Sequence, residues 1–474
     1  LTDVEFYEIR YGGKPAAFLR GFRALYLGLI FNVLVMGSVS LAAIKFGEII
    51  LGWPGWLTLS IACSITLLYS TLGGLRAIII TDFFQFVLAM IGSVWACFYI
   101  LNLDQIGGIS SLIDHPFVQN KIALTPDFSD PDIWVPILFV PLAVQWWASY
   151  YPGSEPGGGG YIAQRMLSAK DEVNAIGASF LFNIAHYAIR PWPWILIALS
   201  SLIIFPELGD IKNEFPDISE SKIGNDIAYP AMLTLLPSGL LGLVAASLIA
   251  AFMSTMSTQV NLGASYLVND FYHRFINPNA SEKNLVLVGR VFTIISILLG
   301  AATGLILTNA EQAFSLLLLL GSGTGLIYIL RWFWWRISAY TEIIAMFSSL
   351  IIASYLNFFN HSLLPWEKIV IGAFVTTILW VSATFFTPPE AEETLRSFVE
   401  KVKPGGPGWG GYSGSEHGDG WSLPKSILLM TLGSILVYSL LLGFGNLIYS
   451  KIPIGTTLIA IGLFSGWGIY RLWK

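Results

Sequence analysis

The stretch GLLGLVAASLIAAFMSTMSTQVNLGASYLVNDFYHR, residues 239–274, decides the fold of this chain. It is long enough to cross a bilayer as a helix, because about 20 apolar residues suffice at roughly 1.5 Å per residue. A polar stripe nevertheless runs along it, since spacings of three, four and seven place most of these side chains on one helical face. The stripe comprises Ser247, Ala251, Ser254, Thr255, Thr258 and Ser265. In a membrane, such a face either packs against another helix or lines a polar site.

The composition predicts a protein with many membrane spans. Of 474 residues, 55% are hydrophobic and only 12% are charged, and the mean hydropathy is +0.68. Soluble domains carry about 25% charged residues. We therefore expect an all-α protein in which residues 1–474 form a single transmembrane domain. The twelve expected spans are 22–46, 53–72, 79–101, 133–152 continuing past 161, 175–205, 239–272, 285–308, 312–335, 339–358, 365–387, 425–448 and 454–472.

Charge is segregated between the two ends of these spans. If the first span starts inside the cell, most of the 25 Lys and Arg residues fall in inner loops, as the positive-inside rule predicts. The outer loops are acidic, as in residues 126–134 and 207–220. The chain begins with Leu1 and a polar segment that resembles an internal loop. We therefore expect a fragment that lacks the first spans of a longer protein.

Several classes of function lack their sequence signatures. The chain contains no P-loop, no HExxH motif and no Cys/His cluster, and its two Cys residues lie in apolar segments. An intramembrane enzyme would need a nucleophile and a base close together, and the only candidates, His186 and Asp82, are far apart in sequence. We expect no enzymatic activity, no organic cofactor and no nucleic-acid partner.

The longest inner loop, residues 388–424, has a charged first half and a Gly-rich second half. The first half predicts a short surface helix, and the second half predicts disorder. Such a loop could regulate the protein through a partner, or it could simply connect two spans.

The fourth expected span is interrupted by Pro152, Pro156 and the run Gly157–Gly160. Proline removes a backbone donor, and glycine disfavours helix. Backbone groups freed at membrane depth need protein or water partners, as in the interrupted helices of ion-coupled transporters. The alternative is a helix that ends at Tyr151, with the glycines in an inner loop.

Asp82 follows a Gly-Gly pair, residues 73–74, which we expect to form a tight turn between two spans. A carboxylate within a span is costly and is therefore a candidate functional group. It could instead be a helix-end charge, stabilised by the helix dipole and by nearby Arg76.

The hydroxyl groups of the 239–274 stretch suit a sodium ion. Hard cations prefer oxygen ligands, and Ser254 and Thr255 supply two adjacent hydroxyls. Ala251 could add a carbonyl, because a nearby Ser or Thr can loosen the helical hydrogen bond. A seam of small residues for helix packing explains the same pattern equally well.

Three stretches resemble signatures of the sodium:solute symporter family, which includes sodium–galactose, sodium–proline and sodium–sialic acid transporters. They are AAFMSTMSTQVNLGASYLVNDFY (250–272), GGLRAIIITDFFQF (73–86) and YIAQRMLSAKDE (161–172). The resemblance implies a LeuT-like fold of two inverted five-helix repeats. It also implies that this chain lacks the first core helix, which supplies part of the ion and solute sites.

The same resemblance implies roles for individual residues. Ala251, Ser254 and Thr255 match the main sodium site of the family, with Na+ as the coupling ion. Asp82 matches an acidic position that some members use for a second sodium ion. Tyr161 matches the tyrosine that closes the substrate pocket from the inside.

The chain also departs from the family pattern. Residues 152–160 replace the polar pocket residues of the relatives, and the span 175–205 holds Arg190 together with two prolines. The chain therefore resembles an uncharacterised bacterial branch, and no solute identity is carried over.

These features predict sodium-coupled symport of a small organic solute, namely a sugar, amino acid or organic acid, by alternating access. We expect a multi-pass protein of the bacterial inner (plasma) membrane whose partners are sodium, the solute and the bilayer. The alternative is a transporter-like membrane sensor that reports solute to a partner through the 388–424 loop without net transport.

Overall fold

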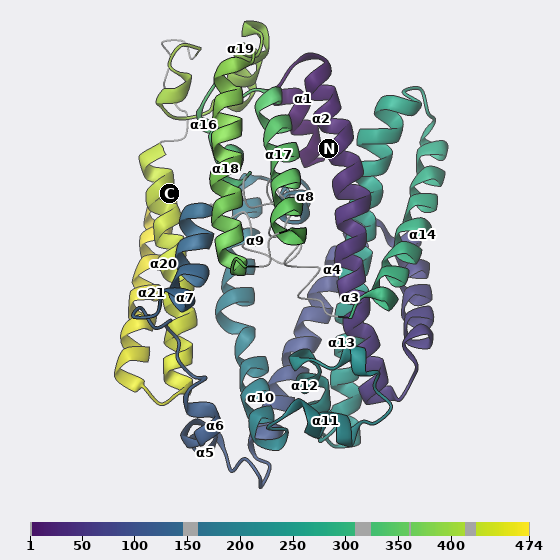
Figure 1. Cartoon of the computed structure of the whole chain (residues 1–474), viewed down its shortest axis with the longest axis vertical. Coiled ribbons are helices and arrows are strands. Elements are labelled where there is room, and N and C mark those ends of the chain that lie inside the picture. The colour runs from purple at the N-terminus through teal and green to yellow at the C-terminus, as the bar shows by residue number, and fades with distance from the viewer. Residues whose placement is uncertain (1, 146–159, 309–323, 360–361, 413–422, 474) are drawn as a thin grey trace.

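The computed structural model describes residues 2–145, 160–308, 324–359, 362–412 and 423–473. These ranges contain helices and no strands, and Figure 1 shows most of the long helices running along the long axis of the molecule. The expectation of an all-α protein is confirmed for the described part of the chain.

The helices have the following bounds. The first half contains α1 (Phe6–Arg10), α2 (Gly13–Leu25), α3 (Asn32–Phe46), α4 (Gly55–Leu101), α5 (Ile109–Asp114), α6 (Pro116–Gln119), α7 (Pro131–Trp134), α8 (Gly160–Leu167), α9 (Glu172–Asn183), α10 (Pro191–Ile204), α11 (Leu208–Glu214) and α12 (Ala228–Leu233). The second half contains α13 (Ser238–Ser265), α14 (Glu282–Ile306), α16 (Gly325–Phe333), α17 (Ala339–Phe358), α18 (Pro365–Phe386), α19 (Glu392–Val402), α20 (Leu423–Ile448) and α21 (Ile452–Trp473).

Several of these helices continue into wider π-helical turns. The π-helical segments are η2 (Tyr26–Phe31), η3 (Gly47–Leu51), η4 (Val135–Val144), η5 (Ile184–Ile189) and η8 (Tyr266–Ile276). The 3-10 turns are η1 (Asp3–Glu5), η6 (Glu220–Lys222), η7 (Asn225–Ile227) and η9 (Pro407–Trp409). Because π-helical turns are rare and often occur at functional sites, η8 is of interest below.

Nine helices within the described residues are long and apolar enough to cross a membrane, and two shorter apolar helices cover Gly55–Leu68 and Pro131–Val144. Eleven of the twelve expected spans fall on these helices. The remaining one, 312–335, begins outside the described residues, and α16 lies in its second half. A multi-pass membrane protein is therefore confirmed.

The expected turn at Gly73–Gly74 falls between two apolar segments of α4, Gly55–Leu68 and Ile78–Leu101. Both outer ends of α4 lie at the same end of the molecule: Gly55 lies beside Glu48, which pairs with Lys222 shortly before α12, and Ile100 packs with residues of α5 and α12. The chain therefore reverses its direction between the two segments, as expected, and the position of the turn at the glycine pair stays a prediction.

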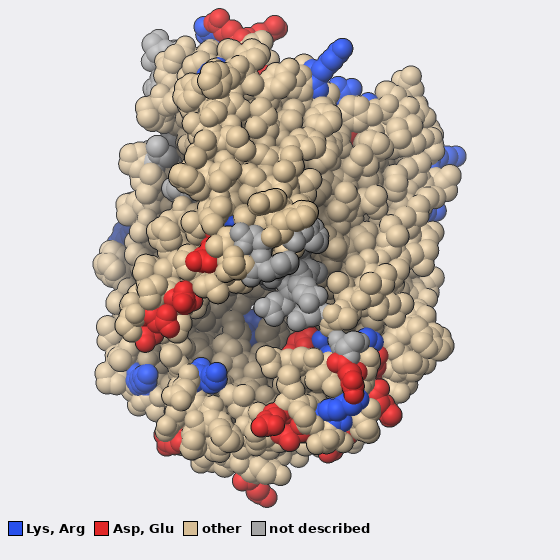
Figure 2. Space-filling model, viewed as in Figure 1, with Lys and Arg blue, Asp and Glu red and all other residues tan. Residues whose placement is uncertain are grey.

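Elements expected on the same side of the membrane lie at the same end of the molecule. In Figure 1, α1 and α19 lie at the upper end, and α5, α6, α11 and α12 lie at the lower end. Figure 2 shows most of the Asp and Glu side chains of this face in its lower half, where the loops expected on the outer side lie. The two-sided arrangement agrees with the charge segregation in the sequence.

Helix α13 occupies a central position, packed against α4, α3 and α14. The residues that fill the space between these four helices are Met36, Ile44, Leu59, Ala62, Cys63, Phe252, Met256, Val260 and Ile297. This packing holds the polar stripe of α13 against α4, which positions the site described below.

The loop 388–424 is more ordered than its composition predicts. Its first part forms α19, as expected, but its Gly-rich part also folds as far as residue 412, with Trp409 only 1% exposed. Leu395, Phe398 and Trp409 pack against Phe6 of α1 and Trp332 of α16. Residues 413–422 lie outside the described ranges. The prediction of disorder fails for 403–412, because a buried tryptophan outweighs the flexibility of its glycine neighbours.

Candidate functional site

The site begins with two hydroxyls on neighbouring positions of α13. The Thr255 hydroxyl donates a hydrogen bond to the Ala251 carbonyl oxygen at 3.1 Å. The Ser254 hydroxyl points to a different helix and donates to Oδ1 of Asp82 at 2.5 Å. The structure therefore brings all four candidate ion-binding residues together, although Asp82 and Ser254 are 172 residues apart in the chain.

Asp82 lies in the second apolar segment of α4, four residues after it begins at Ile78. Its side chain is 22% exposed, and its second oxygen, Oδ2, lies 3.3 Å from Nη2 of Arg165. The carboxylate thus has a hydroxyl donor on one oxygen and a cation on the other. It contacts two other helices, α13 and α8, and its role, as an ion ligand or as a helix-end charge, stays a prediction.

Arg165 was not predicted as part of the site. It lies on α8, and its Nη2 also donates to the Thr258 hydroxyl at 2.9 Å. The preceding residue, Gln164, donates through Nε2 to Oδ1 of Asn261 at 3.2 Å. Two adjacent side chains therefore fasten α8 to one face of α13. The signal in the sequence was the pair QR within YIAQR, directly after the glycine run.

The first residue of α8, Gly160, lies beside a hydrogen bond between Tyr266 and Asp3. The Tyr266 hydroxyl donates to Oδ1 of Asp3 at 2.6 Å. A Cβ atom added to Gly160 would overlap the Tyr266 hydroxyl and would lie 2.7 Å from Oδ2 of Asp3. A larger residue where α8 begins would therefore have to displace the ends of both side chains and disturb their hydrogen bond. Burial raises the pKa of Asp3, and its hydrogen bond from Tyr266 only partly opposes this shift.

Tyr161, the expected inner-gate residue, follows Gly160 in α8. Its side chain lies outside what the structure describes. The same holds for residues 152–159, so the predicted break at Gly157–Gly160 is described only at its last residue. The role of Tyr161 remains a prediction.

An ionic network continues from this region along the inner end. Asp270, whose side chain is fully buried, lies 2.7 Å from Nη2 of Arg20 and accepts a hydrogen bond from Thr2 at 2.6 Å. Arg20 also pairs with Glu8 at 2.6 Å, and Arg274 pairs with Glu8 at 3.0 Å. Burial alone would raise the pKa of Glu8, but the hydrogen bonds from Arg274 and Arg20 outweigh it and lower that pKa. The network fastens the N-terminal segment to η8.

The donor set of the site suits a weakly bound monovalent ion. Within the described residues, no three His, Cys, Asp or Glu side chains come together as a divalent metal site would require. The site offers hydroxyl and carbonyl oxygens with a single carboxylate. Such a set matches the expectation for sodium, which must be released in every cycle.

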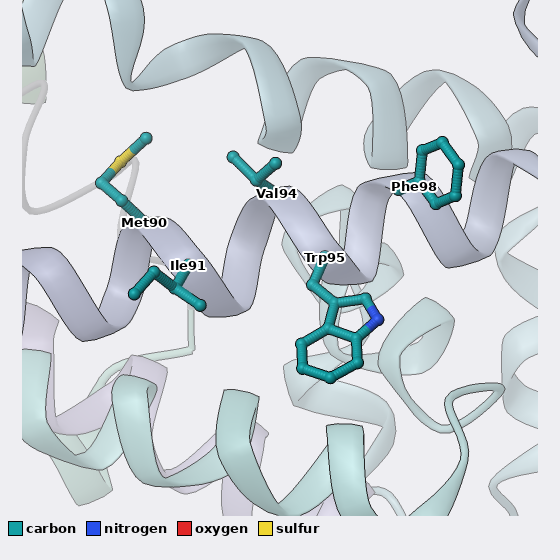
Figure 3. A pocket seen from close by; sticks show the side chains of 5 residues that line it. All are labelled: Met90, Ile91, Val94, Trp95 and Phe98. Atoms are coloured by element: carbon teal, nitrogen blue, oxygen red, sulfur yellow. The ribbon is translucent and has the colours of Figure 1, made fainter.

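Further along α4, a cavity of about 670 Å³ opens beside the helix, lined by Met90, Ile91, Val94, Trp95 and Phe98. Figure 3 shows Met90, Val94 and Phe98 along one edge of the helix, and Ile91 and Trp95 along the other. The lining is apolar apart from the Trp95 ring nitrogen, and four of its five side chains are more than half exposed, as is typical of a helix surface that faces lipid and not of an enclosed solute site.

The sequence of this chain matches a known family of proteins. Residues 1–351 match the model of the sodium:solute symporter family. A sodium/glucose cotransporter of Vibrio parahaemolyticus is 27% identical over 381 residues, which cover 76% of this chain and 67% of the relative. A sodium/mannose cotransporter of Bos taurus is 30% identical over 369 residues, covering 71% of this chain and 58% of the relative.

A sodium/myo-inositol cotransporter 2 of Rattus norvegicus is also 30% identical, over 307 residues that cover 58% of this chain and 43% of the relative. The chain thus spans about half the length of these mammalian relatives.

A solved structure has the same fold. It is the substrate-bound, outward-open state of a Na+-coupled sialic acid symporter, with a TM-score of 0.60 and 18% sequence identity over 82% of this chain and 78% of that one. This likeness confirms the expected LeuT-like fold. Since the family model covers well over half of the residues, the chain belongs to the sodium:solute symporter family.

Proposed function

We propose that this protein carries out sodium-coupled symport of a small organic solute by alternating access. The observation that supports it best is the contact between Ser254 on α13 and Asp82 on α4, beside the Thr255–Ala251 pair. Two hydroxyls, a carbonyl and a carboxylate from two helices lie within one small region, as a cation that bridges helices requires.

The hydrogen bonds of the site favour ion binding by orienting the hydroxyls. A hydroxyl has one donor and two acceptor lone pairs. Because Ser254 donates its proton to Asp82, its lone pairs face away from the carboxylate and are available to a cation. The carboxylate therefore supports Ser254 as a ligand even where sodium does not touch Asp82 itself. We assign Ala251, Ser254 and Thr255 to the main sodium site.

The proposed cycle uses α8 as the inner gate. Sodium binds from the outer side, the solute follows, and inward opening then moves α8 with Tyr161 away from Asp3 and Tyr266. One charge that moves down a potential of 100 mV supplies roughly 2.3 kcal/mol. This free energy supports about 50-fold solute accumulation per ion, before any sodium gradient is counted.

The test is uptake by the purified full-length protein in liposomes. We place the protein in the bacterial inner membrane, and we test glucose, mannose, myo-inositol, amino acids and organic acids in turn. An inward sodium gradient should drive accumulation of at least one solute above its outside concentration, and an equal potassium gradient should not. If a solute binds in a sodium-dependent manner but never accumulates, the protein is a sensor and the symport proposal is wrong.

Asp82→Asn tests a second sodium site at the carboxylate. If Asp82 binds an ion, the variant should move fewer charges per solute and show a lower Hill coefficient for sodium than a wild type above one. A helix-end charge instead predicts an unchanged coupling ratio and a loss of about 0.3–1 kcal/mol in stability. The measurement is the charge-to-solute ratio in liposomes. A wild type with a Hill coefficient of one would count against the second site.

A further inference from the structure

A cationic side chain of the protein itself lies beside Asp82. The guanidinium of Arg165 reaches across from α8 and places Nη2 3.3 Å from Oδ2 of Asp82. Guanidinium groups stay protonated at all physiological pH values. Any sodium ion that approaches this carboxylate therefore meets a permanent positive charge that already occupies one side of it.

The ion pair between Arg165 and Asp82 is long for a hydrogen bond between a guanidinium and a carboxylate. Charge-assisted hydrogen bonds between nitrogen and carboxylate are normally about 2.7–2.9 Å long, and Lys45 pairs with Asp226 at 2.7 Å in this protein. Arg165 divides its Nη2 donor between Asp82 at 3.3 Å and Thr258 at 2.9 Å. Both partners of the ion pair are partly exposed, at 23% and 22%. Because the ion pair is long and partly exposed, Asp82 can exchange Arg165 for another cation at little cost in free energy.

The position of Arg165 links this exchange to the gate. Arg165 is on the same short helix as Gly160, whose Cα is packed against Tyr266 and Asp3. Together with the Gln164–Asn261 hydrogen bond, the contacts of Arg165 with Asp82 and Thr258 help to hold α8 against α4 and α13. A change of partner at Asp82 thus loosens the attachment of α8.

Resting on the symport proposed above, we infer that Arg165 competes with sodium for Asp82. A sodium ion at the carboxylate displaces the guanidinium and weakens the attachment of α8. When the guanidinium returns, it repels the ion and drives its release to the inner side. Arg165 is therefore a positioning residue: it sets the sodium affinity of the site and the timing of ion release.

Neutralising Arg165 should strengthen sodium binding and at the same time slow uptake. Replacing Arg165 by neutral Gln removes the competing charge and retains a hydrogen-bond donor. Since a charge at this distance changes ionic equilibria by one or more factors of ten, half-maximal sodium binding should occur at about tenfold lower sodium. Sodium-driven uptake should nevertheless slow, because release is slower. Arg165→Lys keeps the charge and should retain the sodium affinity of the wild type.

The measurement is sodium-dependent thermal stabilisation of the purified full-length protein, at constant ionic strength with choline as the replacing cation. Arg274→Gln is the matched control, because it removes the same charge from an exposed pair with Glu8 at the same end of the molecule. It should leave sodium binding unchanged. In an Asp82→Asn background, Arg165→Gln should have no further effect on sodium affinity. If Arg165→Gln does not fold, Arg165→Met provides a second neutral variant.

The outcomes separate this inference from the proposed function. Tighter sodium binding with slower uptake in the neutral variants supports it. Unchanged or weaker sodium binding in a folded neutral variant, together with sodium-driven uptake by the wild type, overturns the competition and leaves symport standing. No sodium-dependent stabilisation of the wild type, and no uptake, overturns both.

Discussion

Replacing Ser254 and Thr255 together by alanine is expected to raise the sodium concentration for half-maximal uptake at least tenfold. This change corresponds to a loss of about 1.4 kcal/mol or more of binding free energy. The double variant removes the hydroxyl that contacts Asp82 and the one that contacts the Ala251 carbonyl, while the helix gains two good helix formers. The loss should therefore concern the ion and not the stability of α13.

The measurement is the sodium dependence of uptake in liposomes at saturating solute. Ser257→Ala is the control, since the Ser257 hydroxyl donates only within its own helix, to the Ser254 carbonyl at 3.0 Å. It should leave the sodium dependence unchanged. An equally unchanged dependence in a well-expressed double variant would leave only the packing-seam explanation for the stripe.

A second large effect is expected at Arg10, which is completely buried. Its Nε donates to the Arg331 carbonyl at 2.8 Å, and its Nη2 lies within hydrogen-bond distance of three more carbonyls, those of Trp334, Trp335 and Ile337. Its guanidinium also lies about 5 Å from the rings of residues 11, 398 and 409. Arg10→Met keeps much of the volume but leaves these carbonyls without a donor.

Because each buried polar group left without its partner costs about 1–3 kcal/mol, Arg10→Met should lose roughly 3 kcal/mol or more of stability. Thermal unfolding of the purified protein measures this loss. Arg396→Met on α19 is the matched control: the Arg396 side chain is 59% exposed and pairs with Glu392 of the same helix, so the effect of the change should stay within about 0.5 kcal/mol. Equal unfolding temperatures for the two variants would show that Arg10 contributes little to closing the inner end.

Membrane spans could be predicted well because bilayer thickness fixes the length of an apolar run. The expected spans fall on helices wherever the structure describes them. The exact position of the turn between the second and third spans is harder to predict, because whether a glycine pair turns or continues a helix depends on what packs around it, which composition does not record. The folding of residues 403–412 was missed for the same reason, since Trp409 is buried by α1 and α16 from distant parts of the chain.

For the site, the sequence indicated which residue types mattered but not how they meet. Ser254 and Asp82 were identified separately, by a helical stripe and by an intramembrane charge, and only the fold shows that they share a hydrogen bond. The sequence does not single out Arg165, because the positive-inside rule alone accounts for a basic residue in a loop expected on the inner side. That its side chain points back to Asp82 follows from the docking of α8 on α13.

The burial of Arg10 also bears on how the protein is made. Its carbonyl partners lie 321 to 327 residues further along the chain. A ribosome adds about 5–20 residues per second, so the arginine emerges tens of seconds before α16 is synthesised. Throughout that interval the segment before α2 must remain on the inner side without its final partners. This end of the molecule is consequently among the last parts to assemble.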